Sequence, residues 1–246
     1  MSGPARAARL SPWGRLVVAC AVLLGLVLLG YGVWFAAARH TRDVSYTVSG
    51  TIDGLALDLG DADVQVVGAG QRAPVSVQHV DHYRFNHEAS VSRSVADGMF
   101  RVRSRCPHTV LHDCHVRYRV AVPDNLPLTI RTGGGDVVLR GYHGSARITT
   151  GDGDVDVTGF CGFLLQVRAE GDGDISAGAD CSPAQMTLRS TTGRVRAQVP
   201  GGRYRVEAGT SRGRAVVGRG ITQSTEAPFS LQAFSSTGAV LVERRP

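Results

Sequence analysis

Residues 146–157 read ARITTGDGDVDV, which is a short strand pattern, a glycine turn and a second strand pattern. Apolar residues occupy every second position on both sides of the turn, as in a strand with one buried face. Five further segments share this layout: LTIRTGGGDVVL from Leu128, LQVRAEGDGDISA from Leu165, MTLRSTTGRVRA from Met186, YRVEAGTSRGRAVV from Tyr204 and LQAFSSTGAVLV from Leu231. The second half of the chain therefore repeats one strand–turn–strand unit.

The residue after each turn glycine marks the repeat. These markers are Asp136, Asp154, Asp174, Arg194, Arg214 and Ala239, and successive markers are 18, 20, 20, 20 and 25 residues apart. A period near 20 is typical of stacked β-coils, because one coil cannot bury its own apolar face. We therefore predict an all-β fold, a repetitive β-solenoid or β-roll-like stack with about 20 residues per coil. A β-sandwich with evenly spaced hairpins is the alternative.

Glycine and aspartate are predicted to form the repeat turns. The turn residues are Gly135, Asp136, Gly153, Asp154, Gly173, Asp174, Gly193, Gly213 and Gly238. We expect glycine there because a tight reversal between short strands needs a positive φ, which glycine reaches without steric cost. Beyond the turns, Val155, Ile175 and Val195 should form one inward column, whereas Asp156 and Arg196 should face solvent.

An apolar segment precedes the repeats. Residues 16–38 are 23 residues without a charge, flanked by Arg15 and Arg39. At about 1.5 Å per residue they can cross a hydrocarbon core of roughly 30 Å, which predicts a transmembrane helix. A cleaved signal peptide is the alternative, because residues 36–38 offer an A-x-A site. The apolar stretch is longer than the usual signal core of about 7–15 residues, which favours a retained anchor.

Charge flanking the span indicates its orientation. Arg6, Arg9 and Arg15 precede it without an acidic residue, which favours a cytoplasmic N-terminus in a single-pass protein of the cell membrane. The predicted organisation is a cytoplasmic tail (1–15), a transmembrane helix (16–38), an irregular β or capping region (39–127) and a β-repeat region (128–246). Residues 44–246 would form one continuous extracytoplasmic domain.

Four cysteines follow the span: Cys106, Cys114, Cys161 and Cys181. Cys161 and Cys181 each lie seven residues after the aspartate that marks their coil, so they occupy equivalent positions on adjacent coils. Adjacent strands are about 4.8 Å apart, within the range of Cα separations that a disulfide spans. Cys106 and Cys114 would then close a local loop. Two disulfides indicate an oxidising, extracytoplasmic compartment, and four reduced thiols are the alternative.

The segment 118–141, YRVAVPDNLPLTIRTGGGDVVLRG, is followed by TGDGDVDV-like units, and a single N-terminal span precedes it. Together these features resemble the DUF4097 group of bacterial β-repeat proteins, often labelled "putative adhesins". The resemblance covers roughly residues 45–245 and implies a repetitive β domain at the cell envelope. It transfers no catalytic residue. The last units depart from the pattern, because Thr-Gly-Arg and Ser-Arg-Gly-Arg replace the acidic turn.

Two groups of side chains suggest metal chemistry. Zinc-type ligands gather within ten residues, namely Cys106, His108, His112, Cys114 and His115. Their spacing is not a usual zinc pattern, and oxidised cysteines cannot bind zinc as thiolates. His79, His82 and His87 form a looser group that we expect to face solvent. We therefore predict no metal site among these residues.

Stacked acidic turns raise the question of calcium. Asp152 would lie over Asp172 and Asp154 over Asp174, and a hard cation would relieve their repulsion. The nine-residue spacing of calcium-binding β-rolls is absent, however, and turn chemistry alone explains these residues. We predict no cofactor.

Charge is segregated along the chain. Residues 44–182 contain 12 arginines and 17 acidic residues, whereas residues 183–246 contain 10 arginines and 3 acidic residues. The basic end suits anionic lipid headgroups or anionic envelope polymers, although a solvated basic surface without a partner is the commoner case. Nucleic acid is not expected outside the cell.

Composition and motifs argue against catalysis. All 27 basic residues are arginine, which excludes lysine-dependent chemistry, and the sequence contains no G-x-S-x-G, Walker A or H-E-x-x-H motif. We predict a non-enzymatic, membrane-anchored protein with an adhesin-like surface-interaction or envelope-scaffold role. One alternative is a sensory or regulatory ectodomain that acts with a membrane-protein partner. The other is a solenoid carbohydrate-active enzyme, for which acidic residues should cluster in a cleft across coils.

Overall fold

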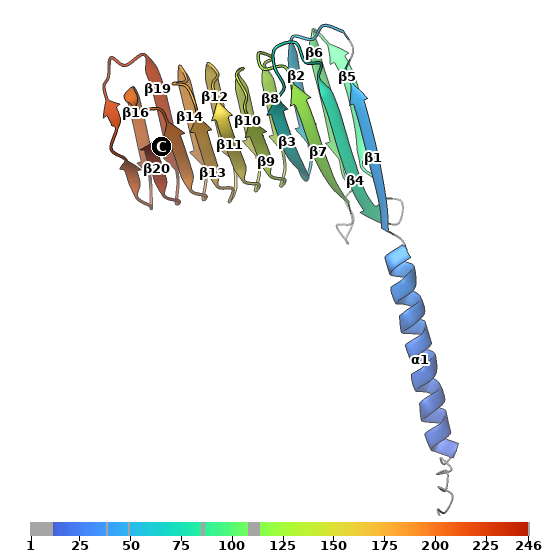
Figure 1. The fold of residues 1–246 in the computed structure, drawn as a ribbon. Helices are drawn as coiled ribbons and strands as arrows, with labels where there is room; N and C mark the ends of the chain where they lie inside the picture. Colours follow the sequence, from blue (N-terminus) through green and yellow to red (C-terminus); the bar gives the residue numbers. More distant parts are fainter. Residues whose placement is uncertain (1–11, 38, 49, 85–86, 108–113, 246) are drawn as a thin grey trace, which may run out of the picture. The chain divides into compact units, whose positions relative to one another are not determined.

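The computed structural model describes the chain except for residues 1–11, 38, 49, 85–86, 108–113 and 246. The fold is mostly β, with one N-terminal apolar helix followed by two ten-stranded sheets (Figure 1). The chain divides into two compact units, residues 1–40 and residues 41–246.

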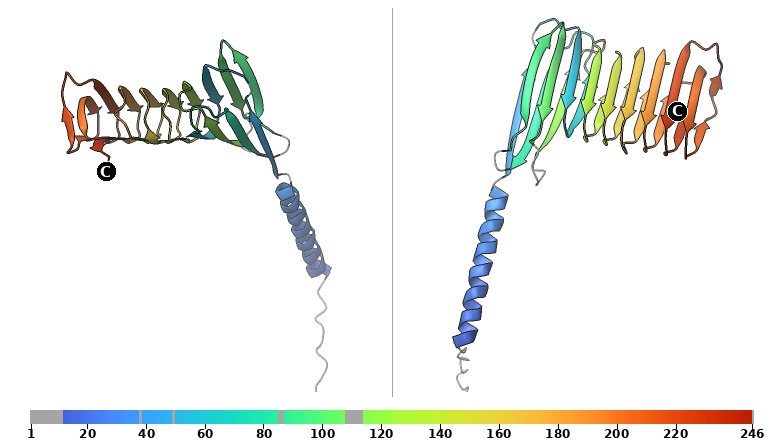
Figure 2. Two further views of the ribbon diagram at one scale, coloured as in Figure 1. Left: turned by 45° about the horizontal axis from the view of Figure 1, so that its top comes forward. Right: turned by 180° about the vertical axis from the view of Figure 1, so that it is seen from behind.

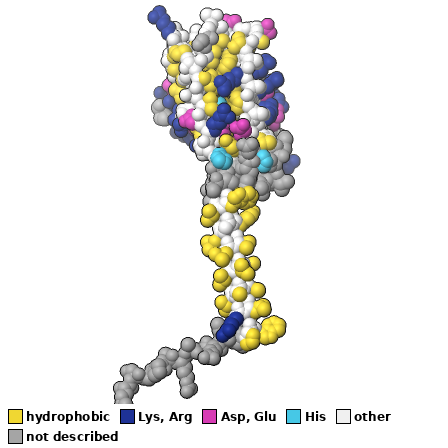
Figure 3. Space-filling model, turned by 90° about the vertical axis from the view of Figure 1, so that its right-hand side faces the viewer, with side chains coloured by type: hydrophobic (Ala, Val, Ile, Leu, Met, Phe, Trp, Pro, Cys, Tyr) yellow, Lys and Arg dark blue, Asp and Glu magenta, His cyan; other side chains and the backbone are white. Residues whose placement is uncertain are grey.

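The helix α1 (Pro12–Ala37) begins four residues before the predicted span and contains residues 16–37 of it; residue 38 lies outside the described residues. Proline suits the first helical position, where its missing N–H would have no partner. Residues 12–35 are apolar enough to cross a membrane, with a mean hydropathy of 2.6 over the best window. Apolar side chains cover the visible surface of α1 (Figure 3). A membrane anchor and a signal sequence both fit these properties.

The strands of each sheet lie side by side along the β unit (Figure 2). Sheet A contains, in spatial order, β1 (Arg39–Thr47), β4 (Ser76–Arg84), β7 (His115–Val122), β3 (Ala62–Gly68), β9 (Val137–Arg140), β11 (Val155–Phe160), β13 (Ile175–Ala179), β15 (Val195–Val199), β20 (Val240–Arg244) and β17 (Ala215–Val217). Sheet B contains β18 (Ile221–Gln223), β16 (Gly202–Thr210), β19 (Phe229–Ser235), β14 (Gln185–Ser190), β12 (Leu164–Ala169), β10 (Ala146–Thr150), β8 (Leu128–Thr132), β2 (Gly54–Leu59), β6 (Met99–Arg105) and β5 (Ser90–Ala96).

Each repeat unit contributes one strand to each sheet, and equivalent strands pair in parallel. Val155 pairs with Ile175, and Ile175 with Val195, as the repeat predicts. All three side chains are at most 1% exposed, so the inward column is confirmed. The alternating side chains of both sheets join in a single apolar core. Asp156 and Arg196, one position along the same strands, are exposed.

The last two units do not stack in sequence order. The strands β19 and β20 lie between the unit of β14 and β15 and the unit of β16 and β17. After β15 the chain first forms the outermost unit, β16 and β17. It then returns to place β19 and β20 between that unit and the unit of β14 and β15. The order of units in space therefore differs from their order in the sequence at this end, where the last two markers are 25 residues apart.

The first half adds strands beyond the repeats. β2 and β3, from LALDLGDADVQVV, pair with β8 and β9 as one further unit. Beyond them, β6 and β7 continue the parallel pairing, whereas β5 pairs antiparallel with β6 and β4 antiparallel with β7. Both sheets are therefore mixed, with their antiparallel strands at one end.

Candidate functional site

The turn glycines stack directly on one another. A side-chain carbon added to Gly153 would overlap the carbonyl oxygen of Gly135, and one added to Gly173 would overlap that of Gly153. The same contact recurs through the glycine column, which consists of Gly135, Gly153, Gly173, Gly193, Gly238 and Gly213. None of these six glycines has a positive φ. The predicted reason for glycine is therefore wrong: close approach of successive backbones, not a left-handed conformation, requires it.

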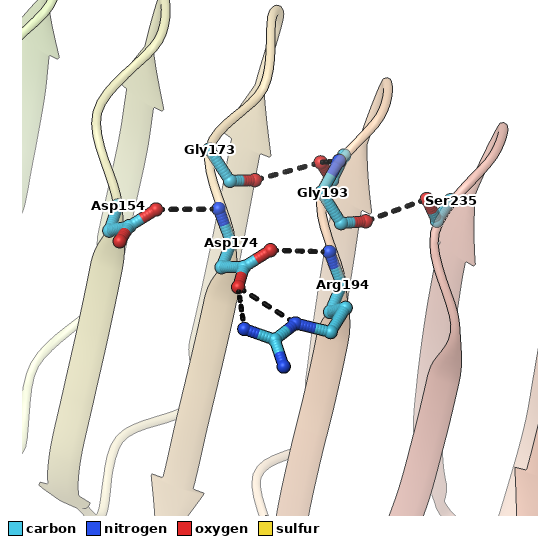
Figure 4. Close-up of polar contacts among 7 residues, drawn as sticks. Asp154, Gly173, Asp174, Gly193, Arg194 and Ser235 are labelled. Atoms are coloured by element: carbon cyan, nitrogen blue, oxygen red, sulfur yellow. Dashed lines mark hydrogen bonds and ion pairs between the residues drawn. The ribbon is translucent and has the colours of Figure 1, made fainter.

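A column of buried hydroxyl groups lies beside these glycines. The Ser190 hydroxyl donates to the carbonyl of Gly173 and accepts from the N–H of Gly193, both at 2.9 Å. The Ser235 hydroxyl donates to the carbonyl of Gly193 at 2.8 Å (Figure 4). It also accepts from the N–H of Gly238 at 2.8 Å. The sequence carries this feature as [ST]-x-x-G, a spacing that was not among the predicted motifs. It occurs at Thr132, Thr150, Ser190, Thr210 and Ser235, and one unit has Ala169 at the equivalent place.

The aspartates after the glycines form a hydrogen-bonded ladder. The N–H of Asp174 donates to Oδ1 of Asp154 at 2.8 Å, and the N–H of Arg194 donates to Oδ1 of Asp174 at 2.7 Å (Figure 4). Asp136 accepts from the N–H of Asp154 likewise. Each of these carboxylates thus accepts a backbone N–H group from the next unit, which stabilises its negative charge. The stacked aspartates therefore need no cation to reduce their mutual repulsion.

Arg194 ends the ladder. Its Nε and Nη2 donate to Oδ2 of Asp174 at 2.9 and 2.6 Å. Burial raises the pKa of the Asp174 carboxyl, but the hydrogen bonds from Arg194 outweigh this and the net pKa is lowered. The change from Asp-Gly-Asp to Thr-Gly-Arg turns therefore places a cation where the next carboxylate would have been.

The candidate metal ligands named from the sequence do not gather into a site within the described residues. His108 and His112 lie outside the described residues. In the part of the chain that the structure describes, no group of three His, Cys, Asp or Glu side chains is placed to hold a metal ion. His115 instead contacts Asp63, with Nε2 3.0 Å from Oδ2.

Two disulfides are present, in the pairing that the repeat suggested. Cys161 and Cys181 follow β11 and β13, and their Cα atoms are 4.8 Å apart. Cys106 and Cys114 join the end of β6 to the start of β7, with Cα atoms 5.7 Å apart. Disulfides are typical of oxidising compartments, so they indicate an extracytoplasmic β unit. Cys20 in α1 is free and exposed.

One histidine prediction is wrong. His79 is 2% exposed and faces inward beside Asp81, at 3%. In β4 and the residue before it, Val75, Val77, His79 and Asp81 alternate with partly exposed residues, so the period of two places the histidine in the core row. His82, one position out of this alternation, is exposed as expected.

The buried pair lacks full hydrogen bonding. Nε2 of His79 lies 3.8 Å from Oδ2 of Asp81, and the ring stacks on Tyr118 with centroids 5.3 Å apart. Among the described residues, Nδ1 of His79 and Oδ1 of Asp81 have no hydrogen-bond partner. Burial lowers the pKa of His79 and raises that of Asp81, and each group partly opposes the shift of the other. Both groups therefore favour their neutral forms.

An extended polar surface lies on the outer face of sheet B, over β8, β10, β12, β14 and β19. Four exposed arginines occupy it: Arg131, Arg147, Arg168 and Arg189, called here the arginine face. These five strands contain no acidic residue. Strand register aligns three of these arginines with Thr149 and Phe234 in one row, in the order Arg131, Thr149, Arg168, Arg189, Phe234. The arginine face was not singled out from the sequence, because its members come from four different repeats.

Two adjoining hollows follow this row. One, of about 600 Å³, is lined by Arg168 and Arg189 together with Thr191, Phe234 and Ser236. The other, of about 410 Å³, shares both arginines. It adds Arg147 and the side chains of Thr149, Gln166, Gln185, Thr187 and Gln232. The two hollows adjoin at Arg168 and Arg189 and follow the row across the strands.

Comparison with known proteins supports the fold and leaves the family open. No family model matches the chain, and no curated protein matches it. A solved structure described as a "putative cell adhesion protein" from Clostridium sporogenes ATCC 15579 is 12% identical, with a TM-score of 0.50. The match covers 84% of this chain and all of that chain. A "putative adhesin" from Bacteroides fragilis NCTC 9343 is also 12% identical, covering 84% of this chain and 97% of its own, with a TM-score of 0.37. The first likeness shows a shared fold; the DUF4097 resemblance stays a prediction.

Proposed function

We propose that the chain is a membrane-anchored, extracytoplasmic interaction protein with an adhesin-like role. The observation that carries this proposal is the arginine face, an open polar surface that crosses several repeats. The disulfides support an oxidising compartment, and α1 supports attachment to the membrane. The Clostridium protein of the same fold is described as a "putative cell adhesion protein", which agrees with this role.

We also propose that the β unit is a two-sheet parallel β-solenoid rather than a sandwich, capped at one end by β1 and β4 of sheet A and β5 of sheet B. Parallel pairing between equivalent strands of successive units supports this class. Sandwiches are built mainly from antiparallel strands.

A non-enzymatic role fits the acidic side chains better than carbohydrate cleavage does. A solenoid enzyme would need a cleft with free paired carboxylates. In the aspartate ladder, Asp136, Asp154 and Asp174 instead accept backbone N–H groups. These carboxylates therefore support the stack.

Display and adhesion test the proposal together. The full chain with a C-terminal epitope is produced in bacterial membranes, and intact cells are probed with antibody and with a membrane-impermeant protease. We expect the epitope to be accessible without lysis, and these cells to retain isolated cell-wall fragments better than cells that carry α1 alone. An epitope that is reached only after lysis, or equal retention by both cell types, would overturn the proposal.

A further inference from the structure

We propose that the arginine face binds a linear anionic polysaccharide whose chain runs across the strands of sheet B. This inference rests on the proposed extracytoplasmic role and names the chemistry of the partner. Its residues are Arg131, Arg147, Arg168 and Arg189, with the polar groups that line the two hollows between them.

Register sets the spacing of the charges. Arg131 pairs with Thr149, Thr149 with Arg168, and Arg168 with Arg189. With adjacent strands about 4.8 Å apart, Arg168 and Arg189 lie roughly 10 and 14 Å along the row from Arg131. Arg147 lies two residues before Thr149 on β10, and therefore flanks the row. A flat parallel sheet thus presents a line of cations that an extended polymer can follow.

These cations are not neutralised by the protein. Within the described residues, no carboxylate forms an ion pair with Arg131, Arg147 or Arg189. Asp58 lies opposite Arg131 in the sheet, but its carboxylate binds Arg103 and Arg105 at 3.3 and 2.8 Å.

The remaining arginine of the face is paired only loosely. Nε of Arg168 is 3.6 Å from Oε1 of the exposed Glu170. On sheet A, by contrast, Arg196 donates to Glu243, and Glu243 also accepts from Gln198. Arg147 donates from Nε to Oε1 of Gln166 at 2.8 Å, a neutral partner that leaves its charge uncompensated. The charge of the arginine face is therefore largely unbalanced by the protein, and this points to an external anion on sheet B.

The groups between the arginines suit a sugar chain. Amides of Gln166, Gln185 and Gln232 and hydroxyls of Thr149 and Thr187 line the same hollow, and they can donate to and accept from sugar hydroxyls. Arginine binds carboxylates through two parallel N–H bonds. The ring of Phe234, with the Arg189 guanidinium 5.6 Å from its centroid, offers an apolar face for a sugar ring.

A lipid bilayer fits this surface less well. Within β8, β10, β12, β14 and β19, which the structure describes in full, no exposed large apolar side chain is available to enter a membrane. Phe234 is only half-buried and lies beside Arg189. The polar lining and the straight row both favour a soluble polymer.

Binding of polygalacturonate to the full chain in phosphatidylcholine nanodiscs tests the inference, with neutral dextran as the comparison polymer. We expect polygalacturonate to bind and dextran not to bind. The variant R147Q/R168Q/R189Q should weaken binding at least tenfold, because three charge-assisted contacts are lost. Raising the salt concentration from about 50 to about 200 mM should also weaken it, since exposed charges are screened.

The matched control is R119Q/R140Q/R214Q, which removes three exposed arginines on the side of sheet A and leaves the same net charge. It should bind like the unchanged chain. Equal losses in the two triple variants would mean that net charge alone attracts the polymer, and would overturn the inference. Far-UV circular dichroism checks that both variants are folded.

Two further measurements sharpen the result. R147K/R168K/R189K keeps the charge but loses paired N–H donation, so it should bind more weakly than the unchanged chain and more tightly than the glutamine variant. Binding to phosphatidylglycerol vesicles but not to polygalacturonate would overturn the polysaccharide in favour of a membrane. If polygalacturonate does not bind, but cells that carry the full chain still retain cell-wall fragments, the polysaccharide inference fails and the adhesin-like role stands. If the C-terminal epitope cannot be reached on intact cells, the adhesin-like role fails whether or not the polymer binds.

Discussion

Gly153 has no room for a side chain, because the backbone of the preceding unit lies directly against it. A methyl group would overlap the carbonyl of Gly135, which belongs to backbone that cannot rotate away. We predict that Gly153→Ala destabilises residues 41–246 by about 3 kcal/mol or more, at or above the usual range for overpacking. Urea unfolding followed by far-UV circular dichroism measures this change.

Gly178→Ala is the matched control. Gly178 is buried like Gly153, but it lies within the strand β13. A side-chain carbon added there would lie 3.6 Å or more from its neighbours, which is ordinary van der Waals contact. Its φ is not positive, so alanine should change the free energy of unfolding by less than about 0.5 kcal/mol or increase it slightly. Equal losses at both positions would refute the close-approach explanation of the glycine column.

The buried His79 predicts a pH dependence of stability. Its folded pKa lies below the ordinary 6.5, so just below pH 6.5 the unfolded chain binds more protons than the folded chain. The stability contributed by the neutral imidazole is complete above pH 6.5 and is lost as the pH falls towards the folded pKa. Asp81 acts in the opposite sense, because its raised pKa lets the folded chain take up a proton at a higher pH than the unfolded chain does. The contribution of His79 should therefore appear as a fall in the urea midpoint below about pH 6.5 that depends on this residue.

His79→Gln should flatten this part of the pH profile, because it removes the group that charges. His82→Gln, at an exposed position of the same strand, should leave the slope unchanged. Parallel profiles for the unchanged chain and His79→Gln would mean that the imidazole is not held neutral.

At the scale of the strand, alternation separates core from surface. Ile175 in β13 is 1% exposed between Val155 and Val195. Ile175→Ala should cost about 2–5 kcal/mol, because neighbours on both sides keep the cavity open. Asp156→Ala, at an exposed position of β11, should cost less than about 0.5 kcal/mol. Far-UV circular dichroism during urea unfolding is the measurement, and equal costs would contradict the register. Arg196 is a poorer control, since it binds Glu243.

The same alternation accounts for what could be predicted from the sequence and what could not. The inward positions of Val155, Ile175 and Val195 could be predicted, because two patterns agree there: the alternation of apolar residues along each strand and the spacing of about 20 residues between repeat units. The hydroxyl column was readable as [ST]-x-x-G, but serine and threonine are common before turns of every kind, so the spacing alone does not indicate a buried column. The cross-strand neighbours of Arg131 and Arg189 could not be predicted from the sequence, because they depend on the order in which the units stack.

The two disulfides link segments next to different strands, and their pairing can be tested by peptide mapping. Non-reducing peptide mapping should find Cys161 joined to Cys181 and Cys106 joined to Cys114. The first bond closes a loop of 20 residues between adjacent coils. Replacing both of its cysteines by serine should cost about 3 kcal/mol, the magnitude expected for a loop of this size. A crossed pairing, or free thiols at these positions, would contradict both the coil register and the oxidising compartment.

For the whole molecule, topology was less predictable than local structure. Turn glycines identify the repeats, yet they do not say which unit lies next to which. The unit of β19 and β20 fills the position beside β14 and β15, where its apolar residues continue the core rows: Leu231 pairs with Met186, and Val240 with Val195. Any unit with the same alternation offers a similar face, so order is settled by the connections and not by the pattern.

The last prediction concerns the attachment of the molecule to the membrane. The helix α1 has 26 residues, about 39 Å at 1.5 Å per residue, more than a hydrocarbon core of roughly 30 Å requires. An apolar segment of this length exceeds a usual signal core, and a retained anchor is therefore expected. Intact mass of the membrane fraction should match the full 26.0 kDa chain, and N-terminal sequencing should not begin near Arg39. Ala36→Leu/Ala38→Leu, which destroys the A-x-A site, should leave the mass of the product otherwise unchanged. A larger product from this variant than from the unchanged chain would reveal cleavage after residue 38, and the β unit would then be released rather than held at the membrane.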